Sequence, residues 1–187
     1  MRIRVKGAAL SGGVGDWLGS EISVSNKNRD GLIHDKHSLE ISEAGKSLGF
    51  EEIKTRIFEY DIFPPHRMIT RLCKQRKMLS VGDTIIQFVI LGPLALEMAV
   101  HVTEICDESD SDLNRAGFTY ATLEGHAEEG NCTFLVTESK RENTIRFEIE
   151  TWSAPGNWVS LLLRPCTRYL QQKYTNEALH HVLRQKR

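Results

Sequence analysis

The residues best suited to chemistry lie in one short stretch, from Tyr120 to Glu128. Tyr120 and Thr122 alternate along a strand-like segment, so their side chains should share one face. His126 and Glu128 follow in a loop bounded by glycines. A histidine beside a carboxylate can transfer protons, since the ordinary pKa of imidazole is about 6.5. The same groups could instead orient a bound ligand, or serve only as turn-capping and core residues.

Other sets of chemistry-bearing residues have unsuitable spacing. His180 and His181 are adjacent, so a helix would point them about 100° apart, too far for one metal ion. The acidic run 107–112 lacks the glycine and the bidentate glutamate that a calcium loop needs. Ser153 is not part of a G-x-S-x-G elbow. We therefore expect no metal, no other cofactor and no hydrolase nucleophile.

The composition predicts one ordinary globular domain. Of 187 residues, 40% are hydrophobic and 26% are charged, as in folded rather than disordered proteins. No apolar run approaches the roughly 18 residues of a membrane-spanning helix. Lys and Arg number 24 against 25 Asp and Glu, a balance that argues against nucleic acid as the main partner. We expect neither nucleic-acid binding nor integral membrane association.

The cysteines and the N-terminal residues indicate a cytoplasmic protein. None of the four cysteines forms a C-x-x-C pair with another: Cys73, Cys106, Cys132, Cys166. The apolar stretch near the start is too short for a signal peptide. We therefore predict free thiols in a reducing compartment.

The chain divides into an N-terminal tail and a body. Residues 1–36 hold six of the 14 glycines, but the glycine-rich part lacks the Lys and Ser/Thr of a phosphate-binding loop. We predict a flexible tail or linker over 1–36 and one folded domain over 37–187.

Hydrophobic spacing predicts mixed α and β structure in the body. Apolar residues at helical spacing predict a short helix over 50–58 and a second after Pro64 and Pro65, over 67–74. The apolar run 84–91 predicts a strand buried on both faces. Alternating patterns predict further antiparallel strands over these ranges: 94–103, 118–123, 132–138, 145–150.

The C-terminal part predicts a long amphipathic helix, from about 165 to 184. Apolar residues recur every four positions from Trp158 to Val182, and Tyr169 widens the stripe. Such a helix is about 30 Å long and could cross a whole sheet. We expect it to cover the concave face of the sheet, with Leu170, Tyr174 and Ala178 buried. The predicted class is α+β.

The stretch 117–126, G-F-T-Y-A-T-L-E-G-H, resembles the signature of an uncharacterised family of bacterial and plant proteins, a domain of unknown function. That signature is approximately G-F-x-Y-G-T-L-x-G-H-x-x-x-G-E-x-x-F. The resemblance covers about 37–185 and continues through Glu128, Gly130 and the run FEIETWSAP at 147–155. The chain departs from the family pattern at three positions: Ala121, Asn131, Ala154.

This family is similar to the helix-grip superfamily, the SRPBCC group of START-like lipid-transfer domains, polyketide cyclases and pollen allergens. The resemblance implies a curved antiparallel sheet with two short helices and a long C-terminal helix packed over the concave face. It also implies a hydrophobic cavity but supplies no reaction, because fold does not fix function.

The predicted function is binding of a small hydrophobic or amphipathic ligand between the sheet and the C-terminal helix. Tyr120, Thr122, His126 and Glu128 are predicted to supply the polar groups of that cavity. One alternative is a small enzyme of lyase, cyclase or hydrolase type, with His126 or Glu128 as acid or base. Another is a protein-interaction module with a collapsed cavity. Binding is favoured over catalysis because no nucleophile or metal set accompanies these residues.

Overall fold

The computed structural model describes residues 2–5, 17, 19–23, 31–42, 48–73, 78–156 and 164–184. Its helices are α2 (Phe50–Phe58) and α4 (Arg164–Val182). Its strands are β1 (Arg2–Val5), β2 (Ile33–Ser42), β3 (Met68–Leu72), β4 (Thr84–Leu91), β5 (Leu94–Ser109), β6 (Leu113–Thr122), β7 (Glu128–Ser139) and β8 (Thr144–Pro155). The predicted α+β class is confirmed, as is the helix-grip arrangement of an antiparallel sheet with a long C-terminal helix; of the two expected short helices, the described residues contain α2.

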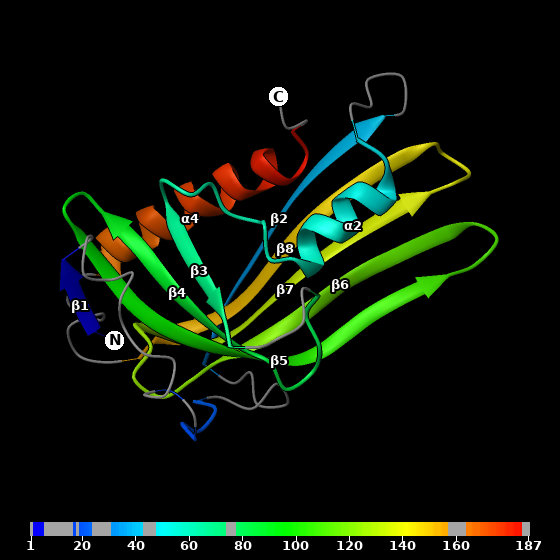
Figure 1. Ribbon diagram of the computed structural model, residues 1–187. Coiled ribbons are helices and arrows are strands. Elements are labelled where there is room, and N and C mark those ends of the chain that lie inside the picture. The colour runs from blue at the N-terminus through cyan, green and yellow to red at the C-terminus, as the bar shows by residue number, and fades with distance from the viewer. Residues whose placement is uncertain are drawn as a thin grey trace.

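The strands form one antiparallel sheet in the order β2-β8-β7-β6-β5-β4-β3, with β1 paired to the start of β5. Consecutive hairpins join β4 through β8, because short turns place sequential strands side by side. The register of β5 against β6 shifts between Val102 and Glu104, and such a bulge bends a strand. The curved sheet half-encloses α4, which runs along its concave side with α2 at one end (Figure 1).

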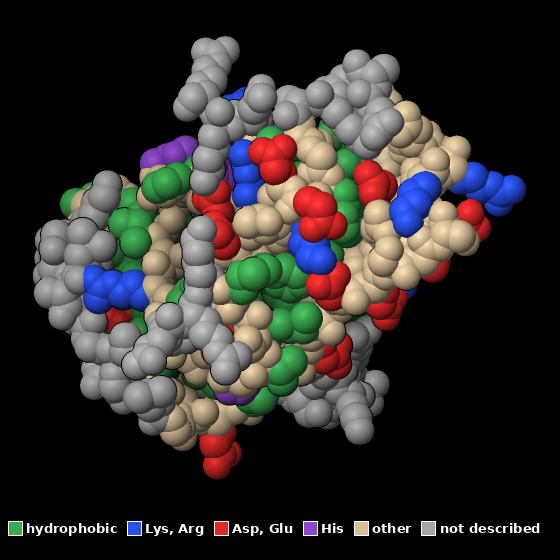
Figure 2. All heavy atoms as spheres, turned by 45° about the vertical axis from the view of Figure 1, so that its right-hand side comes forward, with side chains coloured by type: hydrophobic (Ala, Val, Ile, Leu, Met, Phe, Trp, Pro, Cys, Tyr) green, Lys and Arg blue, Asp and Glu red, His purple; other side chains and the backbone are tan. Residues whose placement is uncertain are grey.

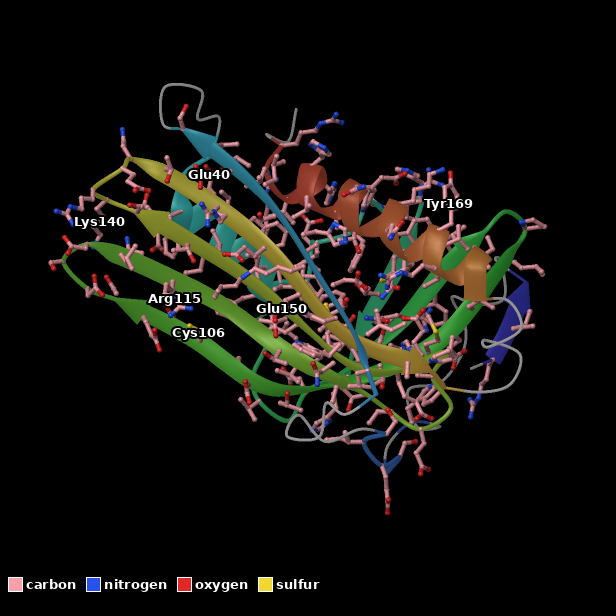
Figure 3. All side chains as sticks on the ribbon, turned by 180° about the vertical axis from the view of Figure 1, so that it is seen from behind. Glu40, Cys106, Arg115, Lys140, Glu150 and Tyr169 are labelled. Atoms are coloured by element: carbon pink, nitrogen blue, oxygen red, sulfur yellow. The ribbon has the colours of Figure 1, made fainter. Side chains whose placement is uncertain are left out.

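The main core lies on the concave face, where side chains of β6, β7 and β8 meet α2 and α4. Its largest fully buried members are aromatic or β-branched: Phe118, Phe134, Phe147, Ile53, Ile57, Ile145. From α4, Tyr174 and Ala178 are buried as predicted, and Leu170 is half-buried. Tyr169 was expected on the same stripe. It is instead 63% exposed on the outer side of the helix (Figure 3).

A second, smaller core lies on the opposite face of β4. Ile86, Phe88 and Ile90 pack there with Trp17, so β4 is covered on both faces as its unbroken apolar run predicted. Trp17 is held by a hydrogen bond from its Nε1 to Glu97 Oε1, at 2.9 Å. Parts of the expected tail therefore contribute to the folded body.

The N-terminal limit of the body lies earlier than the sequence suggested. Strand β2 begins at Ile33, so the predicted boundary between residues 36 and 37 falls inside a strand. His34, Asp35 and Lys36 lie within the range 1–36 that was predicted as tail or linker. They form part of an edge strand paired with β8, and such a strand needs few apolar side chains on its solvated face.

The second short helix was wrongly predicted. Residues 68–72 form β3, paired with β4 in antiparallel register. Its apolar residues fit either period over so short a segment. These residues form a strand because the edge of β4 is available for pairing. The N–H of Cys73, for example, donates to the carbonyl oxygen of Thr84, at 3.0 Å.

Among the described residues, no helix is long and apolar enough to cross a membrane. On the face that Figure 2 shows, the described acidic and basic side chains are interleaved. The three cysteines whose side chains are described, Cys73, Cys106 and Cys132, are free thiols as predicted. Cys166 lies outside the described side chains.

Candidate functional site

A cavity of about 180 Å³ separates the sheet from residues 170–175 of α4. Its walls are mainly apolar, which is typical of sites for small molecules. The residues that shape it come from strands β3 to β8 and from α4, and they include these: Gln87, Val89, Leu91, Leu96, Met98, Tyr120, Leu170, Tyr174. His126, from the loop after β6, and Glu128, at the start of β7, close one side.

A smaller hollow of about 60 Å³ adjoins this cavity and shares six of its residues. All four residues of the sequence hypothesis line it: Tyr120, Thr122, His126, Glu128. The loop and the end of β6 therefore bring together the side chains that alternation and the bounding glycines suggested. Their part in binding stays a prediction.

His126 has one ring nitrogen engaged and one without a partner. Its Nδ1 accepts the backbone N–H of Glu128, at 3.1 Å, in a turn where Gly125 adopts a φ of 79°. Its Nε2 is shielded from solvent and has no hydrogen-bond partner in the described structure. Burial lowers the pKa of His126 to about 4. The ring is therefore neutral near pH 7, with its proton on Nε2 because Nδ1 is an acceptor.

Glu128 does not form the expected histidine–carboxylate pair. Its carboxylate interacts with the hydroxyl of Ser153, whereas the contact with His126 is through the backbone N–H. Burial raises the pKa of Glu128, while the Ser153 hydrogen bond and the charge of Arg168 oppose that rise. A proton shuttle from His126 to this carboxylate is therefore not assembled.

The hydroxyl of Thr122 is engaged by the backbone of Gly130 and by the hydroxyl of Ser23, whose oxygen lies 2.5 Å away. It accepts the N–H of Gly130, at 2.9 Å, and lies 3.2 Å from the carbonyl oxygen of the same residue. Only glycine fits at position 130, because an added Cβ would lie 1.9 Å from the carbonyl oxygen of Trp152. Thr122 thus joins the ends of β6 and β7 and keeps the loop closed over the cavity.

Tyr120 belongs to a buried polar group that the sequence analysis missed. Gln87, 2% exposed, donates its Nε2 hydrogen to Tyr60 Oη, at 2.6 Å, and Tyr120 interacts with Gln87 and Cys132. Burial raises the pKa of Tyr120 well above its ordinary value and that of Cys132 to about 12. Both groups are therefore neutral. The sequence feature that could have identified Gln87 is that it is the one amide side chain in the apolar run of β4.

Ion pairs anchor α4 over the cavity at several points. Arg168 forms a two-pronged pair with Asp35 of β2. Arg67 holds Glu177 by two hydrogen bonds, at 2.6 and 2.9 Å. At the end of the helix, Arg56 donates to the carbonyl oxygen of Val182, at 3.0 Å. No group of three or more metal-binding side chains occurs among the described residues.

A family model described as a domain of unknown function (DUF1990) matches residues 20–181. The chain belongs to this family. The resemblance inferred from the signature around Tyr120 and His126 is thereby confirmed, and the match begins before the predicted domain start at residue 37.

Two kinds of relatives extend this comparison. A UPF0548 protein of Dictyostelium discoideum is 27% identical over 84 residues, which span 42% of this chain and 38% of that protein. A hypothetical protein of Helicobacter pylori has a similar structure, with a TM-score of 0.58 at 10% identity over 92% of this chain and 93% of that one. A major latex-like protein of Panax ginseng gives a TM-score of 0.43 at 16% identity, over 82% and 100%. At these identities the structural likeness concerns the fold.

Proposed function

We propose that this protein binds a small, mainly apolar molecule in the cavity between the concave face of the sheet and α4. The observation that carries the proposal is the cavity itself, about 180 Å³ and walled by residues such as Val89, Leu96 and Met98. Apolar surface left unfilled forfeits the contacts that a packed core would provide. A ligand of matching shape restores them.

The polar groups at one end of the cavity support binding better than catalysis. His126 is neutral, and its Nδ1 is occupied by a backbone N–H. Glu128 faces Ser153. An enzyme would need an acid or base poised near the working pH and within reach of a partner. The alternative of acid–base chemistry lacks that arrangement, while Tyr120 and His126 remain suited to orienting a ligand.

Native mass spectrometry of protein purified from its own host tests the proposal, since a bound molecule adds a defined mass. A cavity-filling variant, Val89→Phe, should lose that mass, because the larger ring would occupy the space. Val81 is 61% exposed and lies outside the cavity, so Val81→Phe is the matched control and should retain the ligand. Equal retention by both variants would place the ligand elsewhere and refute the proposal.

A further inference from the structure

The ring of His126 offers one hydrogen-bond donor with nothing to accept it. Nδ1 receives the Glu128 N–H, so the ring proton lies on Nε2. That nitrogen is shielded from solvent and unpartnered among the described residues, and the ring lines both the cavity and the adjoining hollow. Buried donors in folded proteins nearly always have partners. An acceptor atom of a ligand in the cavity would supply the missing partner.

The charges around the cavity favour a neutral ligand. None of the described lining residues is Lys or Arg. The nearby Arg168 is already held by Asp35 through both prongs of its guanidinium. Glu128 is the one acidic residue among those lining groups. A ligand anion would lose its hydration beside a carboxylate and gain no counter-charge, which is costly.

The size of the cavity limits the ligand to about one ring. A cavity of roughly 150 Å³ lined by aliphatic and aromatic residues is known to hold benzene in an engineered protein. The present cavity is about 180 Å³, with a further 60 Å³ in the adjoining hollow beside His126. This space fits one ring with a short substituent directed toward the histidine.

We propose that the ligand is an uncharged, ring-sized apolar molecule with one acceptor oxygen of the ketone, aldehyde, ester or ether type, and that His126 Nε2–H donates to this oxygen. This inference rests on the proposed function, because it assigns a chemical class to the ligand of the same cavity. His126 is then a specificity-determining residue, and the apolar walls supply most of the affinity.

A set of three probes of nearly one shape tests this assignment. Acetophenone carries a carbonyl acceptor, α-methylstyrene replaces that oxygen by a methylene group, and benzoate carries a charge. Titration of the isotope-labelled protein, followed by NMR shifts of cavity residues, gives each dissociation constant. Acetophenone should bind about 2- to 10-fold more tightly than α-methylstyrene, the effect of one neutral hydrogen bond. Benzoate should bind most weakly.

Two variants and an NMR measurement of the His126 tautomer complete the test. His126→Phe should bring the acetophenone preference to about one, since it removes the donor. His101 lies outside the cavity lining, so His101→Phe is the matched control and should keep the preference. Multiple-bond ¹H–¹⁵N spectra of the wild-type protein at pH 7 should show the His126 proton on Nε2, and they require no variant.

The outcomes separate the two proposals. If no probe binds, binding of a ring-sized molecule in this cavity is refuted, and the present inference fails with it. If acetophenone and α-methylstyrene bind equally well, the cavity binds ligands but the role of His126 is refuted. Preferential binding of benzoate would overturn the assignment of a neutral ligand.

Discussion

The two ends of the concave face have the same sheet and the same helix above them, yet one is filled and the other is hollow. At the filled end, Phe118, Phe147 and Ile57 are fully buried. At the hollow end, Val89, Leu96 and Met98 face a cavity. A helix laid on a curved sheet therefore does not by itself determine whether a cavity forms.

The difference comes from what lies between the sheet and α4. Helix α2 contacts β6, β7 and α4 at the filled end, where it inserts Ile53 and Ile57 into the core. Aromatic rings strengthen this end, with Phe118 and Tyr60 centred 5.8 Å apart, a favourable separation for ring pairs. In the part of the chain that the structure describes, no helix takes the place of α2 at the hollow end.

The largest expected effect comes from placing a charge at each end of α4. Ala178 is fully buried at the filled end, whereas Leu170 is half-buried beside the cavity. Ala178→Asp should lower the free energy of unfolding by several kcal/mol, because a buried unpaired carboxylate is strongly unfavourable. Leu170→Asp should cost clearly less. Chemical denaturation measures both, and a Leu170→Asp variant as unstable as Ala178→Asp would show that the hollow end is packed.

Replacing an apolar side chain by alanine at each end, without introducing a charge, tests the same difference between the filled and the hollow end. Phe147 is fully buried and lies outside the cavity lining, so Phe147→Ala should cost about 3–5 kcal/mol by opening a new void. Met98 already borders a void, so part of its surface has no contacts to lose. Met98→Ala should cost about 2 kcal/mol, near the lower limit for such truncations. Similar losses of stability for Phe147→Ala and Met98→Ala, in thermal or denaturant unfolding, would contradict the distinction between a filled and a hollow end.

Stability at acidic pH should reveal His126, whose Nε2 is shielded from solvent at the hollow end. Its pKa is about 4 in the folded protein and about 6.5 in an unfolded chain. Between these pH values the unfolded chain binds a proton that the folded protein does not. The free energy of unfolding should therefore fall as the pH drops from about 6.5 to about 4, by roughly 3 kcal/mol.

Two variants isolate this contribution. The raised pKa of Glu128 acts in the opposite sense, because its folded form keeps a proton that the unfolded chain releases. The contribution of Glu128 remains present in His126→Phe. The difference in pH dependence between this variant and wild type therefore reports on His126 alone. That variant should lose the pH dependence of His126, and His101→Phe should retain it. Parallel curves for wild type and His126→Phe would exclude a depressed pKa.

Local patterning made most of the fold predictable. Strict alternation and the unbroken apolar run 84–91 located the strands from β4 to β8, because a sheet with one or two covered faces imposes those patterns. The hydrophobic pattern failed where pairing with a neighbouring strand determined the structure. Residues 68–72 are too few to distinguish the two periods, and β3 forms because β4 offers an edge. The polar start of β2 gave no apolar signal, since it is an edge strand.

The site was predictable in place but not in its chemistry. The spacing of Tyr120, Thr122, His126 and Glu128 located the residues around the small hollow. The commitment of Thr122 to Gly130 and of His126 Nδ1 to a backbone N–H arises from three-dimensional closure of the loop. Side-chain type and spacing carry no information about which hydrogen bonds are already made. The sequence therefore suggested a histidine–carboxylate pair that the fold does not form.

The smallest effect concerns how each end of α4 is fastened. At the hollow end, the pair between Arg168 and Asp35 is partly exposed, with side-chain exposures of 29% and 17%. Arg168→Met should therefore cost only about 0.5 kcal/mol of stability, after screening by solvent. Loss of this tether should still let the first turns of α4 move away from β2 more often. Acetophenone should then associate faster with the cavity, as seen in NMR line shapes.

The matched control is Arg146→Met, which removes a pair with Glu40 on the outer face of β8 and β2. That change should also cost little, but it should leave the association rate of acetophenone unchanged, because neither residue touches α4 or the cavity. Since Arg56 still caps the far end of α4, Arg168→Met should speed association without unfolding the helix. An association rate equal to that of Arg146→Met would mean that access to the cavity does not pass beneath the start of α4.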